Sequence, residues 1–133
     1  LIYIDDYAHH PREIEASLSS IREMWPDKRL TVAFQPHLYS RTNDFYPEFA
    51  KSLNLADQVI LLDIYPAREQ PIPGVTSGLI AERLTVPFVW VTKEEFPEYV
   101  KENVKEGIFM TVGAGDIDRF IPIFTEMFGG TDC

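Results

Sequence analysis

Cysteine is almost absent from this 133-residue sequence, since the only one, Cys133, is the last residue. A lone cysteine excludes a disulfide framework within the chain and is typical of proteins from a reducing cytosol. Long apolar runs are also missing: no stretch approaches the ~18 consecutive apolar residues that a membrane-spanning helix requires. We therefore expect one globular domain with no membrane partner.

Basic residues are few. The sequence has 12 Lys and Arg against 21 Asp and Glu, which gives a net charge of −9. The acidic excess is spread over both halves, and no basic cluster stands out. Because nucleic-acid binding requires clustered Lys and Arg to neutralise phosphates, we expect no nucleic-acid partner. The charge does not exclude a small anionic ligand, which one arginine or a helix N-terminus can hold.

Common catalytic motifs are missing too. The sequence has no Gly-x-x-x-x-Gly-Lys-[Ser/Thr] loop for nucleotide phosphates and no Gly-x-Ser-x-Gly elbow for a nucleophilic serine. The turn Gly113-Ala114-Gly115-Asp116 is rich in glycine, but Asp118 stands where a dinucleotide fingerprint needs its third glycine. We interpret this segment as a tight turn in which Asp116 is the N-cap of the next helix.

What the sequence does contain is an alternation of apolar runs and helical patterns. The runs are nearly continuously apolar, as in strands buried on both faces. The expected strands are Leu1–Ile4, Leu30–Phe34, Gln58–Ile64, Val86–Val91 and Ile108–Val112, and apolar residues at helical spacing mark Ile14–Trp25, Phe45–Leu53, Leu79–Leu84, Phe96–Val104 and Phe120–Met127. This alternation predicts an α/β domain with a doubly wound, largely parallel sheet and helices on both faces.

Polar side chains gather where the first two expected strands end. Asp5-Asp6-Tyr7-Ala8-His9-His10-Pro11 follows the first strand, and Gln35-Pro36-His37-Leu38-Tyr39-Ser40-Arg41 follows the second. Open α/β sheets bind their ligands at the carboxyl ends of the strands. If these strands are neighbours, the two segments form one site. A third connection, Tyr65–Gly74, contains three prolines, and loops of that length in compact domains are usually functional.

Arg41 is the one cation in this group, and its planar guanidinium suits a carboxylate or a phosphate. A neutral histidine nearby can orient or deprotonate an amine. Together they match the needs of an amino-acid pocket. Two alternatives stay open: Arg41 pairs with Asp44 or Asp5 on the surface, or the histidines and aspartates hold a metal, although no helical His-x-x-x-His pair is present. We interpret His10, which precedes Pro11, as structural.

The segments Ile4–Pro11, Phe34–Arg41 and Tyr65–Gly74 together resemble the C-terminal domain of the Mur ligases, and most closely the alanine-adding branch. The resemblance extends over essentially the whole chain, including the glycine-rich turn. It implies a Rossmann-like three-layer αβα domain with a mostly parallel sheet of five or six strands. It also implies that residues 1–133 are an isolated fragment of a bacterial, cytoplasmic three-domain enzyme, and that this fragment alone is inactive.

The reaction implied by the resemblance is ATP-dependent amide formation between UDP-N-acetylmuramate and L-alanine through an acyl phosphate, in peptidoglycan precursor synthesis. By resemblance, Arg41 would hold the alanine carboxylate, and His9, His37 and Tyr7 would line the amino-acid pocket. Asp6 would hydrogen-bond the ATP ribose. ATP and Mg²⁺ would be held mainly by the central domain, so no metal site is expected here, and the N-terminal and central domains are the expected partners in cis.

Two other interpretations are compatible with the residues. A related ligase that reattaches recycled murein peptide to UDP-N-acetylmuramate shares the Asp-Asp-x-Ala-His-His-Pro turn. A stand-alone Rossmann-like binding module without catalytic activity is the second.

Overall fold

The computed structural model describes residues 1–129, so Cys133 lies outside the described residues. Within them, the strands form one parallel sheet in the order β1-β5-β2-β3-β4. The strands are β1 (Ile2–Asp6), β2 (Leu30–Phe34), β3 (Gln58–Leu61), β4 (Phe88–Trp90) and β5 (Ile108–Val112). The expectation of a mostly parallel sheet with five or six strands is confirmed, with five strands.

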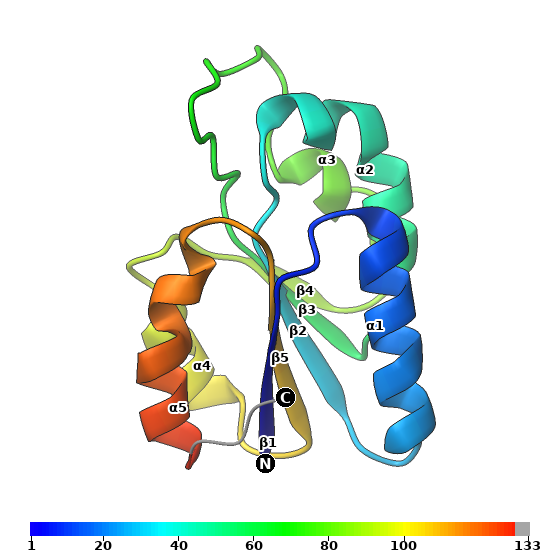
Figure 1. The fold of residues 1–133 in the computed structure, drawn as a ribbon, viewed down its shortest axis with the longest axis vertical. Helices are drawn as coiled ribbons and strands as arrows, with labels where there is room; N and C mark the ends of the chain where they lie inside the picture. The colour runs from blue at the N-terminus through cyan, green and yellow to red at the C-terminus, as the bar shows by residue number, and fades with distance from the viewer. Residues whose placement is uncertain (130–133) are drawn as a thin grey trace.

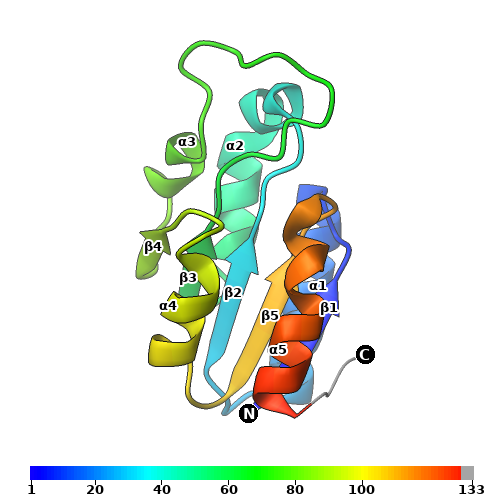
Figure 2. The same cartoon turned by 90° about the vertical axis from the view of Figure 1, so that its left-hand side faces the viewer.

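Helices cover both faces of this sheet (Figures 1 and 2). One face carries α1 (Pro11–Met24), α2 (Tyr39–Leu53) and the short α3 (Gly78–Ala81). The other carries α4 (Phe96–Asn103), the 3₁₀ helix η1 (Asp116–Phe120) and α5 (Ile121–Phe128). The result is the expected three-layer α/β arrangement. No helix of residues 1–129 is long and apolar enough to cross a bilayer.

Alternating strand residues supply the two cores, because successive side chains point to opposite faces of a sheet. Val32 and Phe34 of β2 pack against the α1–α2–α3 layer, whereas Ala33 between them faces the α4–α5 layer. Every residue of β2 and β5 is buried. Central strands covered on both faces have no polar side, which explains why their sequences are continuously apolar.

Two features of the fold differ from the sequence-based expectation. The first two strands are not neighbours, because β5 lies between β1 and β2 and pairs with both. Helix α2 begins at Tyr39, six residues before the first apolar marker Phe45, and it contains Pro47. Asn43, whose carbonyl would accept the bond that Pro47 cannot donate, is exposed to water, which makes this proline tolerable.

Candidate functional site: the carboxyl edge of the sheet

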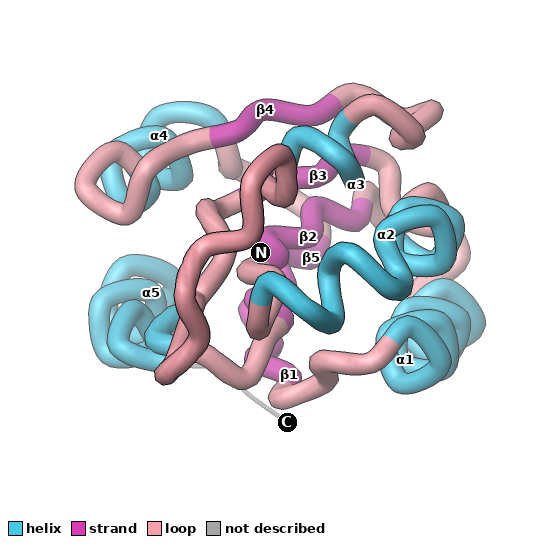
Figure 3. The backbone as a smooth tube through the Cα atoms, turned by 90° about the horizontal axis from the view of Figure 1, so that it is seen from above, coloured by secondary structure: helices cyan, strands magenta, loops and turns pink. Residues whose placement is uncertain are grey.

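The loops that follow β1, β2, β3 and β5 lie together at the carboxyl edge of the sheet, which Figure 3 views from above. Backbone bonds hold the ends of β1, β5 and β2 in register: Gly113 N–H donates to Asp6 O at 3.2 Å, and Gln35 N–H donates to Val112 O at 3.1 Å. The loops after β1 and β2 therefore meet above the end of β5. This explains how segments from non-adjacent strands form one site.

A row of aromatic rings crosses this edge. The ring centroids of Tyr7 and His9 are 5.8 Å apart, and those of His9 and His37 are 6.2 Å apart. The ring of His37 also stacks on Tyr65, with centroids 5.7 Å apart and planes 13° from parallel. The structure thus brings His9, His37 and Tyr7 together, as the sequence predicts, and adds Tyr65 from the proline-rich loop.

Arg41 lies beside the third ring of this row. Its Nη1 is 3.3 Å from Nδ1 of His37, which lies four residues earlier in the chain. The ion pairs within residues 1–129 join other side chains, namely Arg22 with Asp57 and Lys93 with Asp116, and Nδ1 of His9 lies 3.6 Å from the carboxylate of Glu13. The alternative in which Arg41 pairs with Asp44 or Asp5 is therefore wrong. The guanidinium is partly exposed at the carboxyl edge, beside a neutral imidazole.

The hydrogen bonds assign opposite tautomers to the two histidines. Nδ1 of His9 lies 3.1 Å from the carbonyl oxygen of Tyr7, which only accepts, so Nδ1 carries the proton and Nε2 is free to accept. Nδ1 of His37 faces Arg41, which only donates, so the proton of His37 is on Nε2. Burial, with Arg41 and His9 nearby, lowers the pKa of His37 and keeps its ring neutral at pH 7.

His10 has the structural role that the sequence predicts. It is the N-cap of α1, and its Nδ1 accepts the backbone N–H of Arg12 at 3.3 Å. Glu13 completes a capping box by accepting the backbone N–H of His10 at 3.1 Å. Pro11 is buried as the first residue of the helix, where its missing N–H costs nothing.

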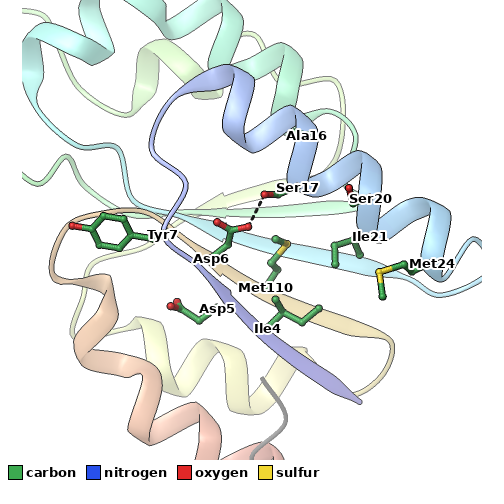
Figure 4. Close-up of a pocket in the computed structure, with 10 residues that line it drawn as sticks. All are labelled: Ile4, Asp5, Asp6, Tyr7, Ala16, Ser17, Ser20, Ile21, Met24 and Met110. Atoms are coloured by element: carbon green, nitrogen blue, oxygen red, sulfur yellow. Dashed lines mark hydrogen bonds between the residues drawn. The ribbon is translucent and has the colours of Figure 1, made fainter. Parts of the chain in front are cut away.

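Asp5 and Asp6 point to opposite sides of β1 (Figure 4). Asp6 accepts the Oγ–H of Ser17 at 2.5 Å and the backbone N–H of Ala8 at 2.8 Å. Asp5 instead accepts the hydroxyl of Thr111 at 2.6 Å. Burial raises the pKa of Asp5 above its usual value. Two carboxylates on opposite faces cannot share one ligand, and no three potential metal ligands cluster among the described residues.

Asp6 borders a hollow of about 520 Å³ between β1 and α1. Ile4, Met110, Ile21 and Met24 give the hollow an apolar floor, and Ser17 and Ser20 add hydroxyls (Figure 4). Each oxygen of Asp6 accepts one hydrogen bond and has a second lone pair available. A hydroxylated ligand with an apolar ring would fit such a surface.

The glycine-rich turn has a different role from the one expected. Asp116 is not an N-cap: that position is Gly115, and Asp116 is the first residue of η1. Its carboxylate instead accepts from Gln35 at 2.6 Å and from Lys93 at 2.7 Å. Burial raises the pKa of Asp116, but these two donors outweigh it, so the pKa is lowered overall. The turn is therefore attached to the β2 loop.

Sequence reasoning missed two contributors to this edge, Glu69 and Gln35. Glu69 accepts the backbone N–H of Ser40 at 3.0 Å and its Oγ–H at 2.5 Å. Gln35 accepts the backbone N–H of Ile117 at 2.9 Å while donating to Asp116. The three prolines of the loop marked the segment around Glu69. No local pattern marks the individual residue, because its partner is 29 positions away.

Known proteins resemble this chain over nearly its full length. A chain from Phocaeicola vulgatus named UDP-N-acetylmuramate–L-alanine ligase is 52% identical over 124 residues, or 92% of this chain, and one of the same name from Porphyromonas gingivalis is 50% identical over 122 residues, or 91%. The chain spans about a quarter (27%) of the length of these relatives.

Solved structures agree with this similarity. The crystal structure of UDP-N-acetylmuramate–alanine ligase from Thermotoga maritima superposes with a TM-score of 0.69 and 28% identity, covering 95% of this chain and 26% of that one. A murein peptide ligase from Psychrobacter arcticus superposes with a TM-score of 0.71, covering 92% of this chain and 26% of that one. At 17% identity, this second likeness shows the fold alone.

A family comparison covers most of the carboxyl-edge site. The family described as "Mur ligase, glutamate ligase domain" matches residues 1–115, which include β1 to β5 and the loops that carry the histidines and Arg41. The chain therefore belongs to the Mur ligase family.

Proposed function

We propose that the protein containing this chain is an ATP-dependent ligase that joins L-alanine to the carboxylate of UDP-N-acetylmuramate, and that residues 1–133 are its C-terminal domain. The observation that carries the proposal is the placement of the Arg41 guanidinium 3.3 Å from the neutral imidazole of His37, with the ring of His9 centred 6.2 Å from that imidazole. Relatives with about 50% identity that have this activity in their names support it.

Each side chain of the row would have a distinct task toward the amino acid. Arg41 holds the alanine carboxylate, because its paired N–H groups match the two oxygens. His37 presents Nε2–H as a fixed donor beside it. His9 presents the unprotonated Nε2, which can accept a proton from the attacking amine. Tyr7, 65% exposed at the start of the row, forms a wall of the pocket.

The residues present fit only part of an ATP molecule. Asp6 has free lone pairs beside the hollow between β1 and α1, which suits the hydroxyls of a ribose. The described residues offer no cluster of three metal-ligating side chains, and the sequence has no P-loop. We therefore assign the phosphates and Mg²⁺ to a central domain outside this chain. There ATP would transfer its γ-phosphoryl group to the muramoyl carboxylate and leave as ADP, and the amine would then attack the acyl phosphate and release phosphate.

Positioning is the main contribution that this domain makes. Aligning an amine with an activated carboxylate lowers a barrier by up to about 7–11 kcal/mol in well-oriented systems. Closure of the domain over the other two would also exclude water from the acyl phosphate. The partners of this chain are then the N-terminal and central domains in cis, together with L-alanine, ATP and UDP-N-acetylmuramate, in the bacterial cytoplasm.

An amino-acid-dependent ATPase assay on the full-length protein tests this function. With UDP-N-acetylmuramate present, we expect phosphate release to depend on L-alanine more strongly than on glycine or L-serine. Dependence on a murein peptide instead would identify the recycling ligase. If phosphate release depends on none of these compounds, both the alanine-adding ligase and the recycling ligase are contradicted. A binding module without catalytic activity would then be the interpretation that agrees with the result.

A further inference from the structure

Helix α2 begins without a cap of its own. Its N-cap residue is Leu38, which has no side-chain acceptor and a left-handed backbone with φ of +75°. The first N–H groups of a helix have no partner within the helix and need acceptors from elsewhere. Leucine is a poor choice for both the cap and the positive φ, so the start of α2 depends on another segment.

Glu69 supplies the missing cap from the β3–α3 loop. One carboxylate oxygen accepts the backbone N–H of Ser40 at 3.0 Å, and the other accepts the Oγ–H of Ser40 at 2.5 Å. A negative charge at this position is also favoured by the helix dipole. These bonds lower the pKa of Glu69, so its carboxylate is ionised at neutral pH.

The same loop holds the preceding residues. Tyr65 N–H donates to Pro36 O, and Leu38 N–H donates to Tyr65 O, both at 2.8 Å. These two bonds enclose His37, whose ring stacks on Tyr65. The proline-rich loop therefore attaches to the β2–α2 connection at two points, Tyr65 beside His37 and Glu69 beside Ser40. His37 lies between the two backbone bonds, and Arg41 directly follows Ser40.

We propose that Glu69 is a positioning residue for the amino-acid site, because its capping of α2 from another loop keeps Arg41 and His37 at the spacing that a carboxylate requires. This inference rests on the proposed function. Glu69 is not assigned a contact with substrate, and it acts through Arg41, the third residue of the helix that it caps.

The negative charge of Glu69 also affects the pKa of His37. Burial is the largest cause that lowers the pKa of His37, and the nearby Arg41 and His9 lower it further. Glu69 acts in the opposite direction and raises this pKa. Removing the Glu69 carboxylate should therefore lower the pKa of His37 further. Substituting a loop residue that does not act on His37 would leave the pKa of His37 unchanged.

The experiment compares Glu69→Ala, Glu69→Gln and the exposed control Glu102→Gln in the full-length ligase. Glutamine keeps an acceptor for the Ser40 N–H but no charge, whereas alanine removes the cap. We expect Glu69→Ala to raise the KM for L-alanine by about tenfold to a hundredfold, as small misplacements in a site do. The KM values for ATP and UDP-N-acetylmuramate should stay within about twofold, and Glu69→Gln should recover most of the loss.

Histidine NMR supplies the independent readout. In both Glu69 variants the His37 resonance should titrate at lower pH than in the wild type, and Glu102→Gln should leave it unchanged. If wild-type enzyme shows no dependence on L-alanine, the proposed function fails. If the wild-type enzyme does depend on L-alanine, two results would overturn the positioning role of Glu69: an unchanged KM for L-alanine in Glu69→Ala, or an equal rise of the KM values for L-alanine, ATP and UDP-N-acetylmuramate. Ser40→Ala, which removes one of the two bonds, provides the same test should Glu69→Ala fail to fold.

Discussion

Arg41 donates to Nδ1 of His37 across 3.3 Å, so a charged side chain and a neutral ring form one unit at the start of α2. An ion pair with a carboxylate would have balanced the positive charge of the Arg41 guanidinium. The neutral imidazole of His37 does not balance that charge, but its hydrogen bond still fixes the orientation of the guanidinium. A guanidinium held in this way is suited to an incoming carboxylate.

If the proposed function is correct, replacing Arg41 by alanine should selectively impair amino-acid binding in the full-length protein. We expect the KM for L-alanine to rise about 10- to 100-fold, because a hydrogen bond to a charged group contributes about 1.5–3 kcal/mol. Steady-state kinetics should show the KM for UDP-N-acetylmuramate little changed. Arg83→Ala, which removes a guanidinium stacked over Tyr46, is the matched control. An unchanged alanine KM would show that Arg41 has been assigned wrongly.

The titration of His37 should depend on Arg41. We expect the ring to protonate below the ordinary value of about 6.5, and Arg41→Ala to move its pKa upward, since Arg41 is one cause of the lowering. Because the unfolded chain protonates first, His37 stabilises the fold above about pH 6.5 and loses this contribution as the pH falls. Histidine NMR of the chain checks the titration, and ¹⁵N shifts should place the proton on Nε2. A pKa that does not respond to Arg41→Ala would contradict the contact.

Gly115→Ala should destabilise the domain. A Cβ at this position would lie 2.5 Å from Oε1 of Gln35 and 2.7 Å from Cβ of Tyr65, inside contact distance. Overpacking of this kind costs about 1–3 kcal/mol, which urea unfolding of the chain can measure. Gly78→Ala is the comparison, because its nearest atoms are side-chain atoms at 3.1 and 3.2 Å. Equal effects of the two substitutions would argue against a tight contact at Gly115.

The chain alone should bind MgATP weakly and should not hydrolyse it. The part described by the structure has Asp6 beside a hollow, but no cluster of three metal-ligating residues, and the sequence has no P-loop. Isothermal titration calorimetry with ATP and Mg²⁺ should give little or no heat at micromolar concentrations. Micromolar affinity would mean that this domain holds the phosphates itself.

Periodicity predicted the layers of this fold well. The gathering of His9, His37 and Arg41 was expected from their places after strands, on the condition that β1 and β2 are neighbours. They are not neighbours, and the residues meet because β5 pairs with both strands. The order of the strands was not predictable in this way. Several strands are equally apolar, and the position of β5 depends on which ones pack best side by side. The start of α2 was missed for a related reason: its cap is Glu69, from a distant loop, and Leu38 carries no local signal of a helix start.

The position of β5 between β1 and β2 has a consequence for synthesis on the ribosome. His9, His37 and Arg41 of the proposed amino-acid site are all encoded before residue 42, yet the strand that joins β1 to β2 ends at Val112. A nascent chain that has exposed its histidines and Arg41 therefore still lacks the strand that brings them together. The site can assemble only after most of the domain has been translated, so its residues stay apart until the fold around them is nearly complete.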